Sequence, residues 1–584
     1  LFQDYPDRIK DRFAQRIDQV LTEWDDYDYW DRTKKTRPLG FHKDGFGGKL
    51  RQAFLRSSLT NTDLLSRRLQ VWTRERIDDK VQSSVFEWSV RLASVAPEAL
   101  ADFSFQAFID PLPSESAERS RGQMIGWSPN MNDWDSPGIS NYSRHCHPAS
   151  PIQQPFAALF EHAPQEGLRL VRRLLSRTVV AWRELPQYDY RNREIPIPFS
   201  VDFPWGTQTF WGDQRIYGWY RGLFSCDILQ SALMALENWA FSELEAGRDV
   251  DEIVRELVTG HESVATLGIA LGVLLDKDAL SPAAAALVGC QHIWAMDEYS
   301  WQHDVQGPHS NEIGASFGLS IDTTHLEALK RLNSRPSRKK NIEWLAKVFV
   351  LTANDQREKI VEQLSGFPAD LPFTHEGQDQ DDNLIKYYRK RAEDWAAIAD
   401  LSNYAQVETE DGRVGVAFQP SDERVQQAEE AGERLAHWNE GFQLLKRADD
   451  QSRDVRVALA REVDNEDLFK SGFDAGDPGS RRAGGVAAMS AAILSLKPDL
   501  PHDQVEWAES VAFRAARTVP ANDEFFHADA PADDRPEKFA SKGLAAIVKN
   551  GRPLAGSAQE ELVRLCFHPY TGVQLAALSN AASC

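Results

Sequence analysis

The sequence predicts a mostly α-helical protein, a helical repeat of the HEAT-like α-solenoid type with an irregular aromatic-rich insert and one small β-hairpin. Three observations support this fold class. Apolar residues recur at helical spacing along most of the chain, three apolar segments share a pattern of small residues, and a few stretches rich in aromatic or turn residues interrupt the periodicity.

Helical periodicity runs through the whole chain and is clear in its first half. Val81, Val85 and Leu92 fall on one helical face, and apolar residues repeat in the same way over 168–182 and 228–241. An apolar stripe of this kind marks the face of a helix that packs on a core. Most of the 584 residues are therefore expected to be helical, and a hydrophobic content of 42% is enough to bury a core.

Small residues are concentrated on three of the apolar segments, 261–271, 481–494 and 568–578. Small side chains let neighbouring helices approach closely, as stacked helical hairpins require. This pattern predicts repeats of about 40–47 residues. The alternative is a set of unrelated buried helices.

Other stretches break the periodicity. Residues 103–155 are rich in Pro, Ser, Asn and Asp, and residues 186–224 combine many aromatics with prolines, which predicts a packed irregular insert with short strands. Residues 406–418 alternate around an Asp-Gly pair, which favours a hairpin turn. Residues 370–382 are acidic and are interpreted as a linker.

These breaks predict three regions. The first, 1–150, is helical with an irregular segment. The second, 151–370, is helical and contains the aromatic insert. The third, 383–584, is a helical repeat region that contains the hairpin.

Charge restricts the classes of partner. The net charge is −22, which repels phosphate backbones and favours basic protein surfaces. One basic run, over 330–340, is the exception, and such runs are usually solvated; nucleic acid is therefore not the expected partner. Five scattered cysteines indicate a reducing cytosol. The longest apolar run, 264–275, is shorter than the ~20 residues of a membrane span, so we expect a cytoplasmic protein without membrane contact.

Motifs of known chemistry are missing from the sequence. It contains no Walker A loop, no dinucleotide fingerprint, no Gly-x-Ser-x-Gly elbow and no His-Glu-x-x-His. We therefore expect no enzyme activity and no cofactor in this segment.

Two titratable clusters offer an alternative to this expectation. Carboxylates beside imidazoles can bind a metal or transfer protons, and the richest such cluster is Asp297, Glu298, His303, Asp304 and His309. A solvated loop between helices explains the same residues.

A second, weaker metal candidate is His145, Cys146 and His147. Adjacent side chains point in different directions, and a polar turn before Pro148 explains them equally.

The aromatic insert is the leading candidate for a binding surface, because Trp and Tyr supply most of the energy at protein interfaces. The alternative is that the rings fill the core. Among the candidates, Trp205, Trp211, Tyr217 and Trp219 are expected to be the most exposed. The predicted binding residues are Trp205, Trp211, Tyr217, Trp219 and Tyr220.

A family resemblance adds to these observations. Residues 155–160 (PFAALF) with 167–171 (GLRLV), 211–222 (WGDQRIYGWYRG) and 231–239 (SALMALENW) resemble parts of very large bacterial proteins. These are similar to the STAND-type NTPases of antiviral defence, whose C-terminal helical region recognises a phage protein. The resemblance implies that this chain is the sensor part and that an NTPase or effector region precedes Leu1. The lack of an initial Met is in keeping with that.

The predicted function is therefore a protein-recognition, or sensor, module of a larger bacterial protein that binds a protein partner on a helical scaffold. Two alternatives stay open. One is an enzyme with an unrecognised acidic and histidine-containing metal site. The other is a structural scaffold that forms homo-oligomers.

Overall fold

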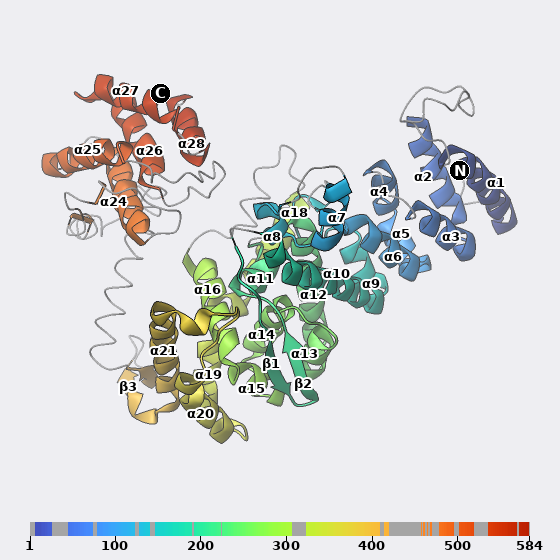
Figure 1. Cartoon of the computed structure of the whole chain (residues 1–584), viewed down its shortest axis with the longest axis horizontal. Helices are drawn as coiled ribbons and strands as arrows, with labels where there is room; N and C mark the ends of the chain where they lie inside the picture. Colours follow the sequence, from blue (N-terminus) through green and yellow to red (C-terminus); the bar gives the residue numbers. More distant parts are fainter. Residues whose placement is uncertain are drawn as a thin grey trace. The chain divides into compact units, whose positions relative to one another are not determined.

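The chain forms two compact units, unit 1 (Leu1–Phe418) and unit 2 (Gln419–Cys584). The computed structural model describes residues 6–25, 45–73, 77, 79–122, 128–140, 146–189, 192–223, 225–306, 323–408, 414–419, 457, 460–461, 464, 468–469, 478–495, 501–518, 535–568 and 571–582. Both units are mostly helical (Figure 1), as the sequence predicts. The boundary between them differs from the expected one, because residues 370–382 lie inside unit 1.

Helices cover more of the first part of unit 1 than the sequence predicts. Its described helices are α1 (Asp7–Asp25), α2 (Gly45–Ser58), α3 (Thr62–Trp72), α4 (Asp79–Phe86), α5 (Ser89–Val95), α6 (Pro97–Phe108), α7 (Pro113–Gly122) and α8 (Met131–Asp135). The prediction that 103–155 is irregular is therefore wrong for the end of α6, for α7 and for α8. Prolines open α6 and α7, which is where a helix accepts a residue without an amide proton.

The centre of unit 1 is built on two helices that are apolar on nearly every side. The described elements here are α9 (Phe156–His162), α10 (Pro164–Glu184), η2 (Leu185–Gln187), α11 (Gln214–Tyr217), η3 (Gly218–Arg221), α12 (Asp227–Glu245), α13 (Val250–Val258), α14 (Ala265–Lys277), α15 (Pro282–Val288) and α16 (Gln291–Gln306). Every residue of α14 from Ala265 to Leu275 is buried. A helix that is hydrophobic all round belongs in the core, and α14 packs there on α12, α13 and η3.

The last part of unit 1 packs against α16 through η4 and α19. Its described helices are α18 (Thr323–Asn333), η4 (Pro336–Lys339), α19 (Ile342–Leu351), α20 (Arg357–Gly366), η5 (Phe367–Ala369), η6 (Gln378–Gln380), α21 (Asp382–Ala396), η7 (Ala397–Ala399) and η8 (Leu401–Asn403). The side chains of Asn341 and Asp381 accept hydrogen bonds from the first free amides of α19 and α21. Such capping fixes where these helices begin.

Two antiparallel hairpins complete unit 1. The aromatic insert contains β1 (Phe199–Phe203) and β2 (Gly206–Phe210), so the short strands expected there are present, and β1 packs on α15 (Figure 1). The predicted hairpin over 406–418 is also confirmed, as β3 (Tyr404–Glu408) paired with β4 (Val414–Phe418). Its Asp-Gly turn lies outside the described residues.

Three of the six basic residues in the run over 330–340 pair with acidic side chains of unit 1. Arg338 Nη2 lies 2.7 Å from Glu237 Oε2 inside the core, and Lys340 Nζ lies 2.7 Å from Asp278. Arg335 pairs with Glu245 on the surface. These three cations are therefore part of the scaffold and are already paired.

Unit 2 is a separate helical body. Its described helices are α24 (Pro478–Ser495), α25 (His502–Ala516), α26 (Pro536–Lys549), α27 (Ala555–Leu565) and α28 (Thr571–Ala582). Helix α26 contacts the other four. A Cβ at Gly543 of α26 would lie 3.4 Å from that of Ala512 in α25, so small residues set this close spacing.

No helix in the described ranges has the length and apolarity that a bilayer span needs.

Candidate functional site

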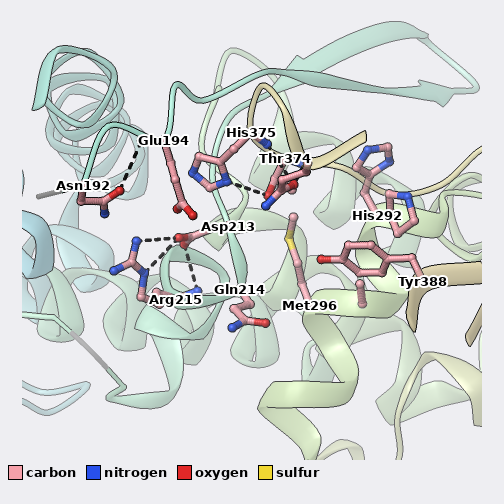
Figure 2. A pocket seen from close by; sticks show the side chains of 13 residues that line it. Asn192, Glu194, Asp213, Gln214, Arg215, His292, Met296, Thr374, His375 and Tyr388 are labelled. Atoms are coloured by element: carbon pink, nitrogen blue, oxygen red, sulfur yellow. Dashed lines mark hydrogen bonds and ion pairs between the residues drawn. The ribbon is translucent and has the colours of Figure 1, made fainter. Parts of the chain in front are cut away.

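A pocket of about 270 Å³ in unit 1 is the candidate site. Four of its walls are the segment before β1, the turn from β2 into α11, helix α16 and the segment before η6. Helix α21 supplies the fifth. Figure 2 shows Glu194, Asp213, Met296, His375 and Tyr388 turned toward the same central space. Such concave sites with convergent polar groups are the usual places for ligands.

The pocket wall before β1 and the pocket wall before η6 are joined by backbone pairing, although the two segments are distant in the sequence. Residues Pro196 and His375 form an antiparallel bridge, Ile197 N donates to Thr374 O at 2.9 Å, and Glu376 N donates to Ile195 O at 2.9 Å. This pairing brings Glu194 and His375 to the same pocket although they are far apart in the sequence.

The segment that carries His375 is held by its own side chains. Gln378 Oε1 accepts hydrogen bonds from the amides of Thr374 (2.9 Å) and His375 (3.2 Å), and Gly377 adopts the positive φ that turns the chain back. Thr374 Oγ1 lies 3.1 Å from His375 Nδ1. Burial lowers the pKa of His375, an effect that the carboxylates of Asp213 and Glu194 partly offset. His375 is therefore a neutral, oriented imidazole near pH 7.

Asp213 and Arg215 form the opposite wall. Asp213 Oδ1 caps α11 by accepting from the amides of Arg215 (3.0 Å) and Ile216 (3.1 Å), and its Oδ2 accepts from Arg215 Nε at 3.0 Å. Gly212 precedes them with φ +139°, and a Cβ there would come within 2.4 Å of Val264. Only glycine fits this turn. The Asp213 carboxylate is consequently fixed and already paired with a cation.

His292 and Tyr388 complete the lining. The His292 ring stacks on Phe199 with centroids 4.5 Å apart, and its Nε2 lies 3.1 Å from the carbonyl oxygen of Phe373. Burial lowers the pKa of His292, so the ring is neutral, and Nε2 must carry the proton because a carbonyl only accepts. Burial also raises the pKa of Tyr388. Its hydroxyl is thus a neutral donor and acceptor.

The predicted binding aromatics are divided between core and partial exposure. Tyr217, Trp219 and Tyr220 are at most 1% exposed. The expectation that Tyr217 and Trp219 are exposed is therefore wrong. Their rings fill the space between η3, α12, α14 and α16, and α14 comes so close that a Cβ on Gly268 would meet the Tyr220 ring at 2.3 Å. Filling a core in this way is the usual role of large aromatics.

Trp205 and Trp211 are half-buried. Trp205 stacks on Phe203 with centroids 4.9 Å apart, and the guanidinium of Arg183 lies 3.9 Å above the Trp211 ring. The backbone of Trp211 also bridges to Ser263. Both side chains are bound into the scaffold and lie outside the pocket lining.

The acidic cluster predicted at 297–309 does not form a described site. Asp297 is buried, where it accepts from Tyr217 Oη at 3.0 Å and from Ile342 N at 2.8 Å, and Glu298 pairs with Arg391. His303 and Asp304 lie in α16, but their side chains and His309 lie outside the described residues. The interpretation as a loop is wrong for 297–304, because these residues belong to a helix. Asp297 of α16 is therefore a structural link to α11 and α19.

The weaker metal candidate is not assembled in the described part of it. Cys146 is buried, whereas His147 is exposed with Nδ1 2.9 Å from Asp227 Oδ2; His145 is outside the described residues. Across the described ranges, no three His, Cys, Asp or Glu side chains are grouped closely enough to hold a metal ion.

Many of the pocket residues were missed because they fall in stretches interpreted as insert or linker, whereas His292, Met296 and Tyr388 lie on helices α16 and α21. Glu194, Asp213 and Arg215 belong to 186–224, and Thr374 and His375 belong to 370–382. The sequence signal that could have identified these residues is the presence of polar side chains within an aromatic block. A block so rich in aromatics must be folded, so its polar residues are held in place. Nothing local could pair 194 with 375.

Neither protein-family models nor curated proteins match this chain.

Proposed function

We propose that this chain is a protein-recognition module that docks a segment of a basic protein partner on the pocket face of unit 1. The observation that carries the proposal is the pocket with its two carboxylates, flanked in sequence by exposed apolar side chains. Ile195, next to Glu194, is 50% exposed, and Tyr387, next to Tyr388, is 58% exposed.

Exposed apolar residues beside a polar pocket suit a protein ligand. Tyrosine is enriched in interface hot spots, and a pocket gives a partner side chain a place to anchor. A small metabolite enclosed in the pocket would leave Ile195 and Tyr387 without contact. We expect a polypeptide that crosses the pocket mouth to extend along these neighbouring segments and reach both side chains.

Charge supports a basic partner. The chain carries 22 net negative charges, and complementary fields speed association and discriminate against acidic surfaces. Two further steps are part of the same proposal. A stacked α-solenoid rests on the repeated small-residue segments of the sequence, and a sensor role in a bacterial STAND-type antiviral protein rests on the sequence resemblance.

A displayed library of random peptides selected on the full chain tests this function. We expect enrichment of peptides rich in Arg and Lys, and loss of their binding to a chain with Ile195→Ser and Tyr387→Ser. The matched control is Val563→Ser, an exposed apolar residue of unit 2 that is 51% exposed. If no enriched peptide distinguishes the pocket-face variant from this control, the proposal is wrong.

A further inference from the structure

We propose that the pocket of unit 1 binds the cationic end of a basic side chain, a guanidinium or an ammonium group. This inference rests on the proposed function, because the partner supplies that side chain. It adds the chemical class of the anchor and the residues that select it.

The charges that face the pocket favour a cation. Its lining contains two carboxylates, Glu194 and Asp213, and one guanidinium, Arg215. Arg215 Nε and Nη2 both lie 3.0 Å from Asp213 Oδ2, so this cation is already neutralised. Glu194 has no ion-pair partner in the part of the chain that the structure describes. A carboxylate facing a pocket without a counter-ion attracts a cation from the ligand.

The other titratable groups of the described pocket lining add no positive charge. Its two imidazoles, His292 and His375, are neutral as described above. The carboxylate of Asp135 acts electrostatically on Arg215, and that of Asp370 acts on His292. An anionic ligand would therefore face several carboxylates with only one guanidinium to hold it, and that guanidinium is already paired.

The walls offer acceptors for the N–H groups of the cation and apolar contact for its stem. The Tyr388 hydroxyl points into the central space, where it can accept a hydrogen bond from a cation (Figure 2). The Met296 thioether and Pro372 also line the pocket. Arg and Lys side chains lay their methylene groups on such surfaces while their charged ends reach polar groups.

The size of the pocket fits one side chain. Its volume of about 270 Å³ lies at or just below the lower end of the roughly 300–1,000 Å³ range of small-molecule sites. A single arginine or lysine side chain fits within such a space.

Capped amino acids test the inference directly. The probes are N-acetyl-arginine methylamide, the lysine analogue, and the citrulline analogue, which keeps the shape of arginine without its charge. Binding to the full chain is followed by saturation-transfer NMR with millimolar probe. We expect the arginine or lysine probe to bind and the citrulline probe to bind at least about tenfold more weakly, because a hydrogen-bonded charge pair is lost.

Three variants assign the effect to residues. Glu194→Gln should weaken cation binding by about tenfold, since it removes the unpaired carboxylate at constant shape. Tyr388→Phe should weaken it by a smaller factor. Glu376→Gln should leave it unchanged, because Glu376 is exposed and is not a lining residue. Thermal unfolding midpoints equal to that of the unaltered chain show that each variant is folded.

The outcomes separate this inference from the proposed function. Equal binding of the citrulline and arginine probes, no binding of any probe, or no effect of Glu194→Gln overturns the cation pocket. If library peptides still depend on Ile195 and Tyr387 in those cases, protein recognition stands. If those peptides are also absent, both proposals fall.

Discussion

Unit 1 buries large aromatic side chains, among them Trp182, Trp219 and Trp294, whereas alanine is the commonest residue in the described core of unit 2. Alanine lets helices pack at short distances over their whole length. Trp182 and Trp294 lie on the regular helices α10 and α16, whereas Trp219 lies on η3 in the irregular insert between α10 and α12. In unit 1 this irregularity also creates the pocket. The comparison therefore separates a close-packed unit rich in alanine from an aromatic unit whose irregular insert supplies walls of a pocket.

The largest effect should follow the loss of an aromatic ring in unit 1. Trp219→Ala is expected to lower the free energy of unfolding of unit 1 by about 3–5 kcal/mol, because it opens a cavity among buried helices. Hydrogen exchange of α12 and α14, followed by mass spectrometry, measures this. Tyr387→Ala, at an exposed site, is the control. A loss below about 1 kcal/mol for Trp219→Ala would mean that the ring is not part of the core.

A comparable loss is expected from the buried ion pair of unit 1. Glu237 is 1% exposed and lies 2.7 Å from Arg338. Glu237→Gln should cost about 3–5 kcal/mol, because Arg338 is left charged in the core. Urea unfolding measures it, with the surface pair partner Glu245→Gln as the control. Similar losses for both variants would contradict the distinction between buried and exposed pairs.

Enlarging a small core side chain, the opposite of the truncation in unit 1, should destabilise unit 2. Ala512→Leu is expected to cost about 1–3 kcal/mol, because overfilling a close-packed core forces its helices apart. Hydrogen exchange of α24 and α26 reports the change. Leu578→Ala, at an exposed position of α28, should have a much smaller effect. If unit 2 accepts the larger side chain without loss, its core is less tightly packed than the spacing at Gly543 indicates.

The smallest expected effect, counted per pH unit, is the pH dependence of the stability of unit 1. Burial, and then the charge of Arg172, lowers the pKa of His261 from 6.5 to about 3, and neither ring nitrogen has a hydrogen-bond partner in the described structure. The unfolded chain takes up this proton below pH 6.5 and the folded chain does not. Stability is therefore complete above pH 6.5 and falls by about 1.4 kcal/mol per pH unit on acidification.

Urea unfolding at pH 7 and pH 5 of the unaltered chain and of His261→Leu measures this contribution. The variant should show a flatter pH profile. Parallel profiles would contradict the burial of a neutral imidazole. In unit 2 the contribution is less simple, because His568, with a pKa lowered to about 4, contacts Glu537, whose pKa burial raises, and the two shifts oppose each other.

The sequence was sufficient for features with a local cause. Apolar periodicity identified α10 and α12, the apolar run with small residues identified α14, and alternation around Asp-Gly identified the β3–β4 hairpin. It was insufficient where the cause is tertiary. The burial of the aromatics on η3 depends on the packing of α12 and α14 against this segment, which no local pattern records. The acidic stretch 370–382 resembles a linker until its backbone pairs with 195–197.

The bridge between Pro196 and His375 also sets an order of events during synthesis. Glu194 leaves the ribosome almost two hundred residues before His375. The pocket can therefore form only after the segment that carries His375 has been synthesised. Closing so long a segment is entropically costly and slow. A protease cut at the turn around Gly377 would therefore release the wall that carries His375 while leaving the buried helices α12 and α14 uncut.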